Sequence, residues 1–257
     1  MTERKPPSHQ ADPKRIREQA AMRAPLPKRF YKDVTLREDP AGWSVLLDGR
    51  PIKTPGKRPL AFPSQQLAEA VAVEWRAQEK IINPGTMPMT RIANTAIEAV
   101  SGQMHEVAND VVAFAGSDLL CYRAAGPEAL VARQSAAWDP IVQWAAAELG
   151  ARFIFAQGIM PVEQTAAALE RVADAVKPLD AFQLSGLHVA TTLTGSALLA
   201  LAVLRERLTP ENAWATAHID EDYQIELWGP DEEAAERRAY RWHEMQAACV
   251  FLRGGSR

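Results

Sequence analysis

Residues 34–49 read VTLREDPAGWSVLLDG, and this stretch decides the fold class of the first part of the chain. Apolar side chains occupy every second position on either side of residues 40–42: Val34, Leu36, Trp43, Val45 and Leu47. Alternation with a period of two is typical of strands with one buried face. The Asp48-Gly49 pair at its end tolerates the positive backbone angles of a tight turn. The stretch therefore predicts strands joined in a hairpin.

The spacing of apolar residues becomes helical after this β-rich segment. Ser64 is a suitable N-cap, and Leu67, Val71 and Trp75 then recur at intervals of four residues. That interval places the three side chains on one face of a helix. Two more helices are expected before residues 117–123, which predict a short strand or an extended connection.

The sequence beyond Gly126-Pro127 predicts an almost wholly helical structure. An apolar stripe runs from Leu130 to Leu149, and Asp139-Pro140 could place a cap and a first-turn proline inside it and so split it into two helices. Further helices are expected over residues 163–176, 182–208, 210–228 and 232–252. The fold class is therefore α+β. The expected parts are a basic disordered tail (1–27), a mostly-β N-terminal domain with helices (28–124) and an all-α helical C-terminal domain (125–257).

Small side chains follow one another at Thr194-Gly195-Ser196-Ala197. Small residues let a neighbouring backbone approach closely, whereas glycine inside a helix costs about 1 kcal/mol relative to alanine. We therefore expect close packing at this point to offset the cost.

Charge is distributed unevenly along the chain. Residues 1–29 carry eight Lys or Arg and three Asp or Glu, whereas the remainder carries 21 basic and 29 acidic residues. Nucleic-acid binding requires a positive face that replaces phosphate counterions, so an acidic body argues against it. The basic segment contains five prolines and predicts a solvated, disordered arm.

Cysteine usage and hydropathy indicate where the chain works. Cys121 and Cys249 have no Cys or His neighbour at metal-ligand spacing, so neither a zinc site nor a disulfide framework is predicted, and a reducing compartment fits. Residues 186–204 are apolar but are interrupted by His188 and by hydroxyl side chains, which favours a buried helix over a membrane span. The N-terminus lacks the apolar core of a secretory signal. We expect neither export nor stable membrane insertion.

Motifs that would hold a cofactor or a nucleophile are missing from the sequence. It contains no phosphate loop, dinucleotide-binding turn, nucleophile elbow or His-Glu-x-x-His metal helix, so no cofactor or metal is expected. His188 predicts a core or interface histidine, and Cys121 a buried small hydrophobe. One enzymatic alternative stays open, in which His188 or His218 acts with a carboxylate such as Glu221 on a small molecule in the helical domain.

The helix predicted over residues 210–228 combines indoles and a carboxylate on one stripe. At 3.6 residues per turn, the stripe contains Trp214, His218, Glu221, Ile225 and Trp228. Aromatic side chains supply large contact areas and a charge selects against wrong partners, so the stripe is typical of a protein-binding surface. The alternative from the same geometry is that Glu221 pairs with His218 or faces water.

Six short motifs follow one another along roughly residues 28–233. They are Gly49 to Pro55 (GRPIKTP), Glu74-Trp75 with Gln78, Pro88 to Ala96 (PMTRIANTA), Ser117 to Arg123 (SDLLCYR), Gln134 with Trp138-Asp139-Pro140 and Trp144, and Asp222-Tyr223-Gln224 with Trp228-Gly229. In these motifs and their order the chain resembles the family of ATP synthase alpha-subunit assembly chaperones. Each motif is short, but their common order makes the match specific.

The resemblance implies a non-enzymatic chaperone with no cofactor, whose client is the free alpha subunit of the F-type ATP synthase head. It implies that Glu221 matches an acidic residue important to the family and that Trp75 matches a family tryptophan, although the apolar helical stripe around Trp75 allows a core role equally. The expected partner-binding residues are Glu221, Asp222, Trp214, His218, Trp228 and Trp75.

The same resemblance implies a mechanism and a location. A monomeric chaperone would cover the subunit interface of alpha reversibly, until the beta subunit replaces it. Relatives work in the mitochondrial matrix or in the bacterial cytoplasm, and the lack of a clear transit peptide favours the bacterial setting. A structural subunit that stays in a permanent complex is the other alternative to the enzyme and the chaperone.

Overall fold

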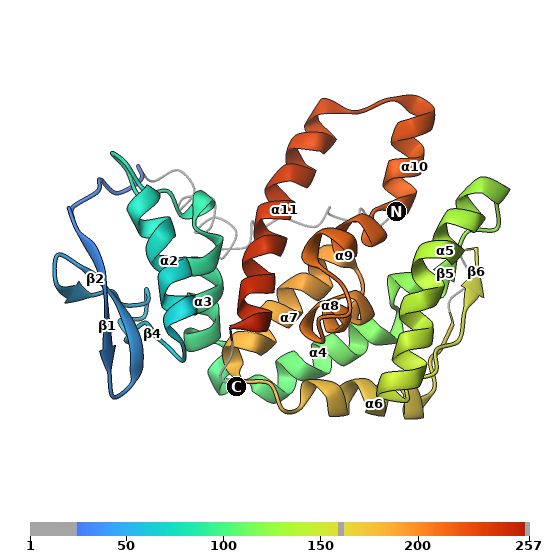
Figure 1. Cartoon of the computed structure of the whole chain (residues 1–257), viewed down its shortest axis with the longest axis horizontal. Helices are drawn as coiled ribbons and strands as arrows, with labels where there is room; N and C mark the ends of the chain where they lie inside the picture. The colour runs from blue at the N-terminus through green and yellow to red at the C-terminus, as the bar shows by residue number, and fades with distance from the viewer. Residues whose placement is uncertain (1–24, 159–161, 255–257) are drawn as a thin grey trace, which may run out of the picture.

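The computed structural model describes residues 25–158 and 162–254, so the predicted tail lies outside the described residues as far as residue 24. A small sheet at one end of the molecule is followed by helices that make up the rest (Figure 1). This is the α+β architecture that the sequence predicts. The last residues of the predicted tail are attached to the fold, because the carbonyl of Pro27 accepts a hydrogen bond from the amide of Ile82 (2.8 Å).

The sheet has β2 (Gly42–Leu47) at its centre, and β2 pairs antiparallel with β1 (Val34–Asp39), β3 (Arg50–Pro51) and β4 (Ala61–Phe62). In the β1–β2 register, Leu36 lies opposite Val45. The side chains of Val45 and Phe62 are fully buried beneath the first helix. The predicted hairpin is confirmed, since Asp48-Gly49 joins β2 to β3 in an antiparallel pair. Val45 and Leu47 are buried as the alternation predicts, but Ser44 and Leu46 are buried as well, so burial does not alternate along β2.

Three helices connect the sheet to the rest of the molecule. They are α2 (Gln65–Ala77), which covers the sheet, α3 (Pro88–Glu98) and α4 (Met104–Gly116). The predicted cap of α2 is confirmed, since the Ser64 hydroxyl accepts the amide hydrogen of Leu67. Short 3₁₀ turns, η1 (Pro84–Thr86) and η2 (Val100–Gly102), precede and follow α3.

The remaining chain is helical apart from a short parallel pair of strands, β5 (Tyr122–Arg123) and β6 (Ala156–Gln157). The helical elements are α5 (Glu128–Trp144) with the π-helical turn η4 (Ala145–Leu149), α6 (Ala166–Val176), α7 (Ala181–Thr194), α8 (Ala197–Leu204), α9 (Pro210–Ala217), α10 (Ile219–Trp228) and α11 (Glu232–Arg253). The 3₁₀ turn η3 (Leu119–Cys121) leads into β5. Pro140 lies inside α5, so the possible split at this residue does not occur.

Two helices predicted as continuous are each broken in the structure. Residues 182–208 divide at Gly195, whose φ of +69° ends α7, and the Ser196 hydroxyl then caps α8 by accepting the amide hydrogen of Leu199. Residues 210–228 divide at His218, which separates α9 from α10. Apolar periodicity continues across both breaks and therefore did not indicate them.

Gly195 lies in a closely packed segment, where the amide of Leu119 donates to its carbonyl oxygen (3.0 Å), but a tighter approach of two helices lies at another glycine. A Cβ atom added at Gly186 would lie 2.7 Å from the backbone oxygen of Ala248 and 2.9 Å from Cβ of Phe251. Helices α7 and α11 therefore approach one another at Gly186, whereas Gly195 serves to end a helix. Close packing at residues 194–197 is therefore present, whereas the expectation that Gly195 lies inside a helix is wrong.

One contiguous core joins the sheet to the helices. Its buried apolar residues run from Tyr31 to Leu252, and α8 is buried along almost its whole length. Helix α4, which falls in the predicted N-terminal domain, packs against α6, α7 and α8. The boundary between residues 124 and 125 therefore stays a prediction. Among the described helices, none has both the length and the apolar content that a membrane crossing needs.

Candidate functional site

Trp214 and His218, at the junction of α9 and α10, lie beneath the surface. Their ring centroids are 4.0 Å apart, and His218 Nδ1 lies 2.7 Å from the carbonyl oxygen of Trp214. Both side chains are buried, and burial lowers the pKa of His218 below its ordinary value. Of the predicted partner-binding residues, these two are thus placed to support α10 from within.

Glu221 lies above this pair in the first turn of α10. Its side chain is 58% exposed, and its carboxylate Oε2 lies 3.9 Å from His218 Nε2. The neighbouring carboxylates are held by other helices, since Asp220 accepts a hydrogen bond from Gln134 Nε2 (2.7 Å) and Asp222 forms an ion pair with Arg238. The carboxylate of Glu221 therefore lies beside the His218 imidazole on one side and is accessible from solvent on the other.

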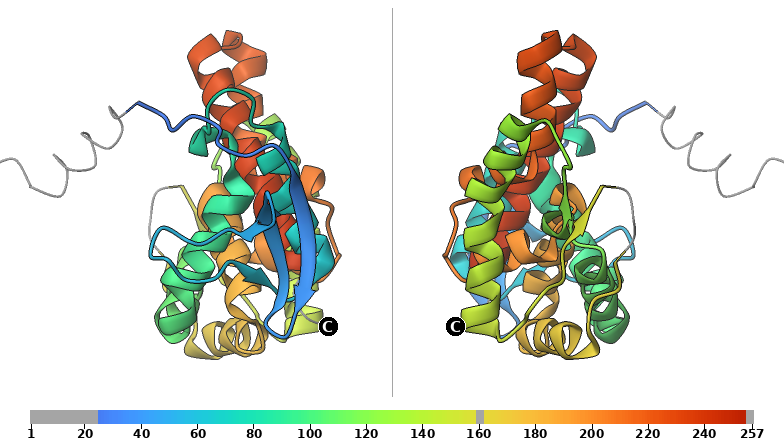
Figure 2. Two further views of the ribbon diagram at one scale, coloured as in Figure 1. Left: turned by 90° about the vertical axis from the view of Figure 1, so that its left-hand side faces the viewer. Right: turned by 90° about the vertical axis from the view of Figure 1, so that its right-hand side faces the viewer.

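The hairpin formed by α10 and α11 projects from the body of the molecule (Figures 1 and 2). Near its end, Trp228 is 82% exposed, and Ile225 and Leu227 are exposed as well. Residues 219–236 contain eight acidic residues and no basic residue. We call residues 219–236 the acidic tip, because they combine exposed apolar side chains with concentrated negative charge.

Helix α5 holds the acidic tip in place. Arg133 forms two parallel contacts of 2.7 Å with the carboxylate of Glu226, and its guanidinium lies over the ring of Tyr223. The indole nitrogen of Trp138 donates to the carbonyl of Thr216 (2.9 Å). Sequence reasoning did not identify these supports, although Trp138 belongs to one of the family motifs.

Trp75 lies on a different surface from Glu221. It is half-buried on α2, where its ring packs against Tyr31 at a centroid distance of 5.7 Å and its carbonyl accepts the Tyr31 hydroxyl hydrogen (2.6 Å). Its indole nitrogen is buried and has no hydrogen-bond partner among the described residues. Trp75 lines a hollow of about 560 Å³ with Phe30 and Arg50. Helices α2 and α10 stand on opposite sides of α11 (Figure 1).

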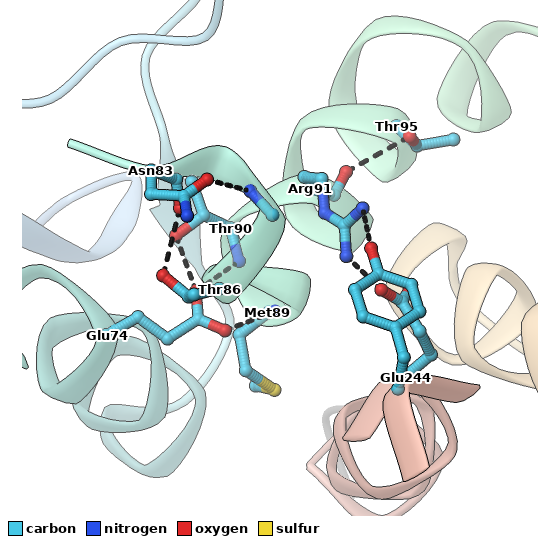
Figure 3. Close-up of polar contacts among 10 residues, drawn as sticks. Glu74, Asn83, Thr86, Met89, Thr90, Arg91, Thr95 and Glu244 are labelled. Atoms are coloured by element: carbon cyan, nitrogen blue, oxygen red, sulfur yellow. Dashed lines mark hydrogen bonds and ion pairs between the residues drawn. The ribbon is translucent and has the colours of Figure 1, made fainter. Parts of the chain in front are cut away.

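A larger cleft, of about 660 Å³, lies between α2 and α11 above the start of α3. Glu74 stabilises its floor by accepting hydrogen bonds from the amides of Met89 (2.6 Å) and Thr90 (2.8 Å) and from the Thr90 hydroxyl (2.8 Å), as Figure 3 shows. Burial raises the pKa of Glu74, and the three donated hydrogen bonds oppose that shift. Helix α3 has no side-chain cap of its own, so Glu74 supplies the acceptor for its first turn.

The far wall of the same cleft is joined to α3 by Arg91. Its guanidinium bonds to the carboxylate of Glu244 and donates to the hydroxyl of Tyr240 (3.2 Å), both on α11 (Figure 3). Two of the motifs that carry the family resemblance, Glu74-Trp75 and PMTRIANTA, thus contact one another directly. Their polar side chains hold α2, α3 and α11 together.

Asp118 plays a comparable part at the centre of the molecule. Its carboxylate is fully buried and accepts the amide hydrogens of Leu198 (3.0 Å) and Leu120 (3.1 Å). Burial raises its pKa to about 6, against the opposing effect of these donors. Cys121 next to it is buried with a pKa raised to about 12, as expected of a small hydrophobe.

The groups named for the enzymatic alternative are only partly assembled. His218 and Glu221 lie beyond hydrogen-bond distance at 3.9 Å, and the imidazole is covered by Trp214. His188 on α7 pairs instead with Asp110 on α4, its Nε2 atom lying 3.6 Å from the carboxylate. Within residues 25–158 and 162–254, no group of His, Cys, Asp and Glu could hold a metal ion.

Comparisons with known proteins place the chain in the class of protein chaperones. The sequence matches the family described as ATP12 chaperone protein over residues 28–146. It is 25% identical over 232 residues to the mitochondrial protein atp12 of Schizosaccharomyces pombe, which covers 83% of this chain and 79% of that one. The chain belongs to the ATP12 chaperone family, which confirms the resemblance found in its motifs.

Solved structures agree with this assignment. Atp12 from Paracoccus denitrificans has a TM-score of 0.81 and 44% sequence identity, over 88% of this chain and 97% of that one. The Atu1473 protein from Agrobacterium tumefaciens has a TM-score of 0.86 and 49% identity, over 95% and 91% respectively. The similarity therefore covers both the sheet and the helical part.

Proposed function

We propose that the chain binds the free alpha subunit of the F-type ATP synthase head and covers its subunit interface until the beta subunit replaces it. The observation that carries the proposal is the acidic tip, where Trp228 is 82% exposed beside a row of carboxylates. A large indole left in water costs free energy unless a partner covers it. Membership of a chaperone family supports the interpretation that this partner is a client protein.

Glu221 provides selectivity in this proposal, and Trp228 with Leu227 provides contact area. Apolar contact gives most of the affinity at protein interfaces, while charged groups reject wrong partners. The family resemblance supports Asp222 and Trp75 as further contacts, with Trp75 reached by a second part of the client. Trp214 and His218 act indirectly, by holding the first turn of α10 beneath Glu221.

Release requires no hydrolysis under this proposal. The beta subunit competes for the same surface of alpha, and a reversible chaperone is displaced by mass action. The chaperone acts as a monomer in the bacterial cytoplasm, where unassembled alpha would otherwise aggregate.

The test is co-purification of the tagged chain with alpha and beta subunits that are expressed separately. The proposal predicts capture of alpha and none of beta, and it predicts that added beta subunit releases alpha. Equal capture of both subunits, or retention of alpha in the presence of excess beta, would show a general holdase or a permanent complex instead.

A further inference from the structure

The cleft between α2 and α11 has the form of a groove for a helix. One wall is a stripe on α11 at helical spacing that contains Tyr240, Ala247 and Val250, and the other is formed by Ala70 and Val73 of α2. From Tyr240 to Val250 the stripe extends about 15 Å, which matches about three turns of a partner helix. The apolar stripe is therefore long enough to contact a short bound helix along its whole length.

Apolar side chains in the groove remain exposed to solvent. Val73 is 54% exposed and Tyr240 is 48% exposed, although both lie on helices whose opposite faces are buried. Each of these side chains would gain about 25 cal/mol for every Å² of apolar surface that a partner removes from water. Helix-in-groove recognition uses this arrangement, with anchors on one face of the bound helix.

The charges around the groove favour a positively charged partner. Glu74 and Glu244 line the groove, and Arg91 balances one of them through its contact with Glu244. Along α11, Glu236 lies about one turn beyond Tyr240. Arg237 and Arg238 lie between the groove and the tip, and each forms an ion pair with a carboxylate of the acidic tip, Glu233 and Asp222 respectively. The acidic tip carries more carboxylates than these two arginines balance, so the surface beyond the groove keeps a net negative charge.

We infer that this groove binds an amphipathic helix of the client, with its apolar face against Val73, Tyr240 and Val250 and its basic residues toward the acidic tip. The inference rests on the proposed function for the identity of the client, and on the groove together with the acidic tip for the chemistry of the bound segment. It gives the chaperone a second contact region beside Glu221, so that two sites on one client are engaged together.

The first experiment measures binding of a fluorescent synthetic peptide of about 14 residues, with Leu at helical spacing on one face and Lys on the other. The parent chain should bind it, and Val73→Asp should weaken binding about tenfold, since a charge would enter the apolar wall. Ile154→Asp, at an exposed residue of the chain outside the groove, should leave binding unchanged. A peptide of the same composition in scrambled order should bind weakly.

Several results would overturn the inference. These are absence of binding by the parent, equal effects of the two substitutions, or a strong gain of peptide affinity on deletion of residues 1–24, which would make the chain's own N-terminal segment the occupant. Capture of the alpha subunit then separates the two proposals. If Val73→Asp still captures alpha like the parent, the groove inference fails while the proposed function stands. If the parent binds the peptide but captures no alpha, the proposed function fails and the groove stands as a helix site.

Discussion

Two acidic residues of this chain, Asp118 and Glu221, perform opposite tasks because their surroundings differ. Asp118 is sealed in the core and supplies hydrogen-bond acceptors to the backbone near the start of α8. Glu221 sits in the first turn of α10 and is open to solvent. Both exploit the excess of unpaired amide hydrogens at a helix start, which favours negative charge. The comparison teaches that burial decides whether such a carboxylate stabilises the fold or remains free for a partner.

The largest effect on stability is expected from substitution of the buried carboxylate, Asp118. Asp118→Ala leaves the amides of Leu198 and Leu120 without an acceptor inside the core, and we expect a loss of about 3–5 kcal/mol in the free energy of unfolding. Urea denaturation measures it. Asp174→Ala, at an exposed carboxylate on α6, is the matched control and should leave stability close to the parent. Equal losses for the two variants would refute the structural role of Asp118.

The pH dependence of stability gives a second test of the buried position of Asp118. The folded-state pKa of Asp118 is about 6, above the ordinary value of 3.8, so the folded state binds the proton more tightly than the unfolded state. This contribution is therefore full below pH 3.8 and is lost as pH rises through 6, by about 3 kcal/mol. Asp118→Asn should remove that part of the slope in unfolding curves measured between these pH values. A slope unchanged by the substitution would contradict the account.

A somewhat smaller loss is expected where α7 meets α11. Gly186→Ala forces a methyl group against the backbone of Ala248, and overpacking of this kind costs about 1–3 kcal/mol. Gly116→Ala is the matched control, since no atom lies within 4 Å of the added Cβ atom at that position. Thermal unfolding of both variants measures the difference. Equal midpoints would show that the two helices separate easily.

His218 should make a smaller contribution to the pH dependence of stability, with a sign opposite to that of Asp118. Burial lowers its folded-state pKa, so the neutral imidazole is favoured in the fold, and stability is lost as pH falls below 6.5. His218→Gln keeps a polar group next to Trp214 but cannot be protonated, so the variant should lose less stability than the parent between pH 7.5 and pH 5.5. A thermal midpoint that falls equally in both proteins would contradict this expectation.

Much of the fold could be predicted because apolar periodicity reports burial directly. The β1–β2 hairpin and the cap of α2 follow from residues 34–49 and Ser64. The breaks at Gly195 and His218 could not be predicted from periodicity, since apolar residues continue on both sides of each break. Likewise, no local pattern indicated that α5 continues through Pro140.

The site could be predicted only in part, for a related reason. The stripe analysis placed Glu221 and Trp228 on a surface, and both are exposed. It also placed Trp214 and His218 there, but the change of direction at His218 turns those two side chains inward. The structural use of Glu74 and Asp118 joins segments far apart in the sequence, so no local pattern indicated it.

The central claim is that Glu221 serves a partner and contributes little to the fold. Glu221→Gln removes the charge without reversing it and should lower the free energy of unfolding by less than about 1 kcal/mol, the usual contribution of one exposed charge at a helix start. The most direct measurement is capture of the alpha subunit by this variant at equal protein concentration. We predict at least about tenfold weaker capture, under conditions in which the variant remains fully folded. Capture equal to the parent, or a loss that merely follows unfolding of the variant, would contradict the account.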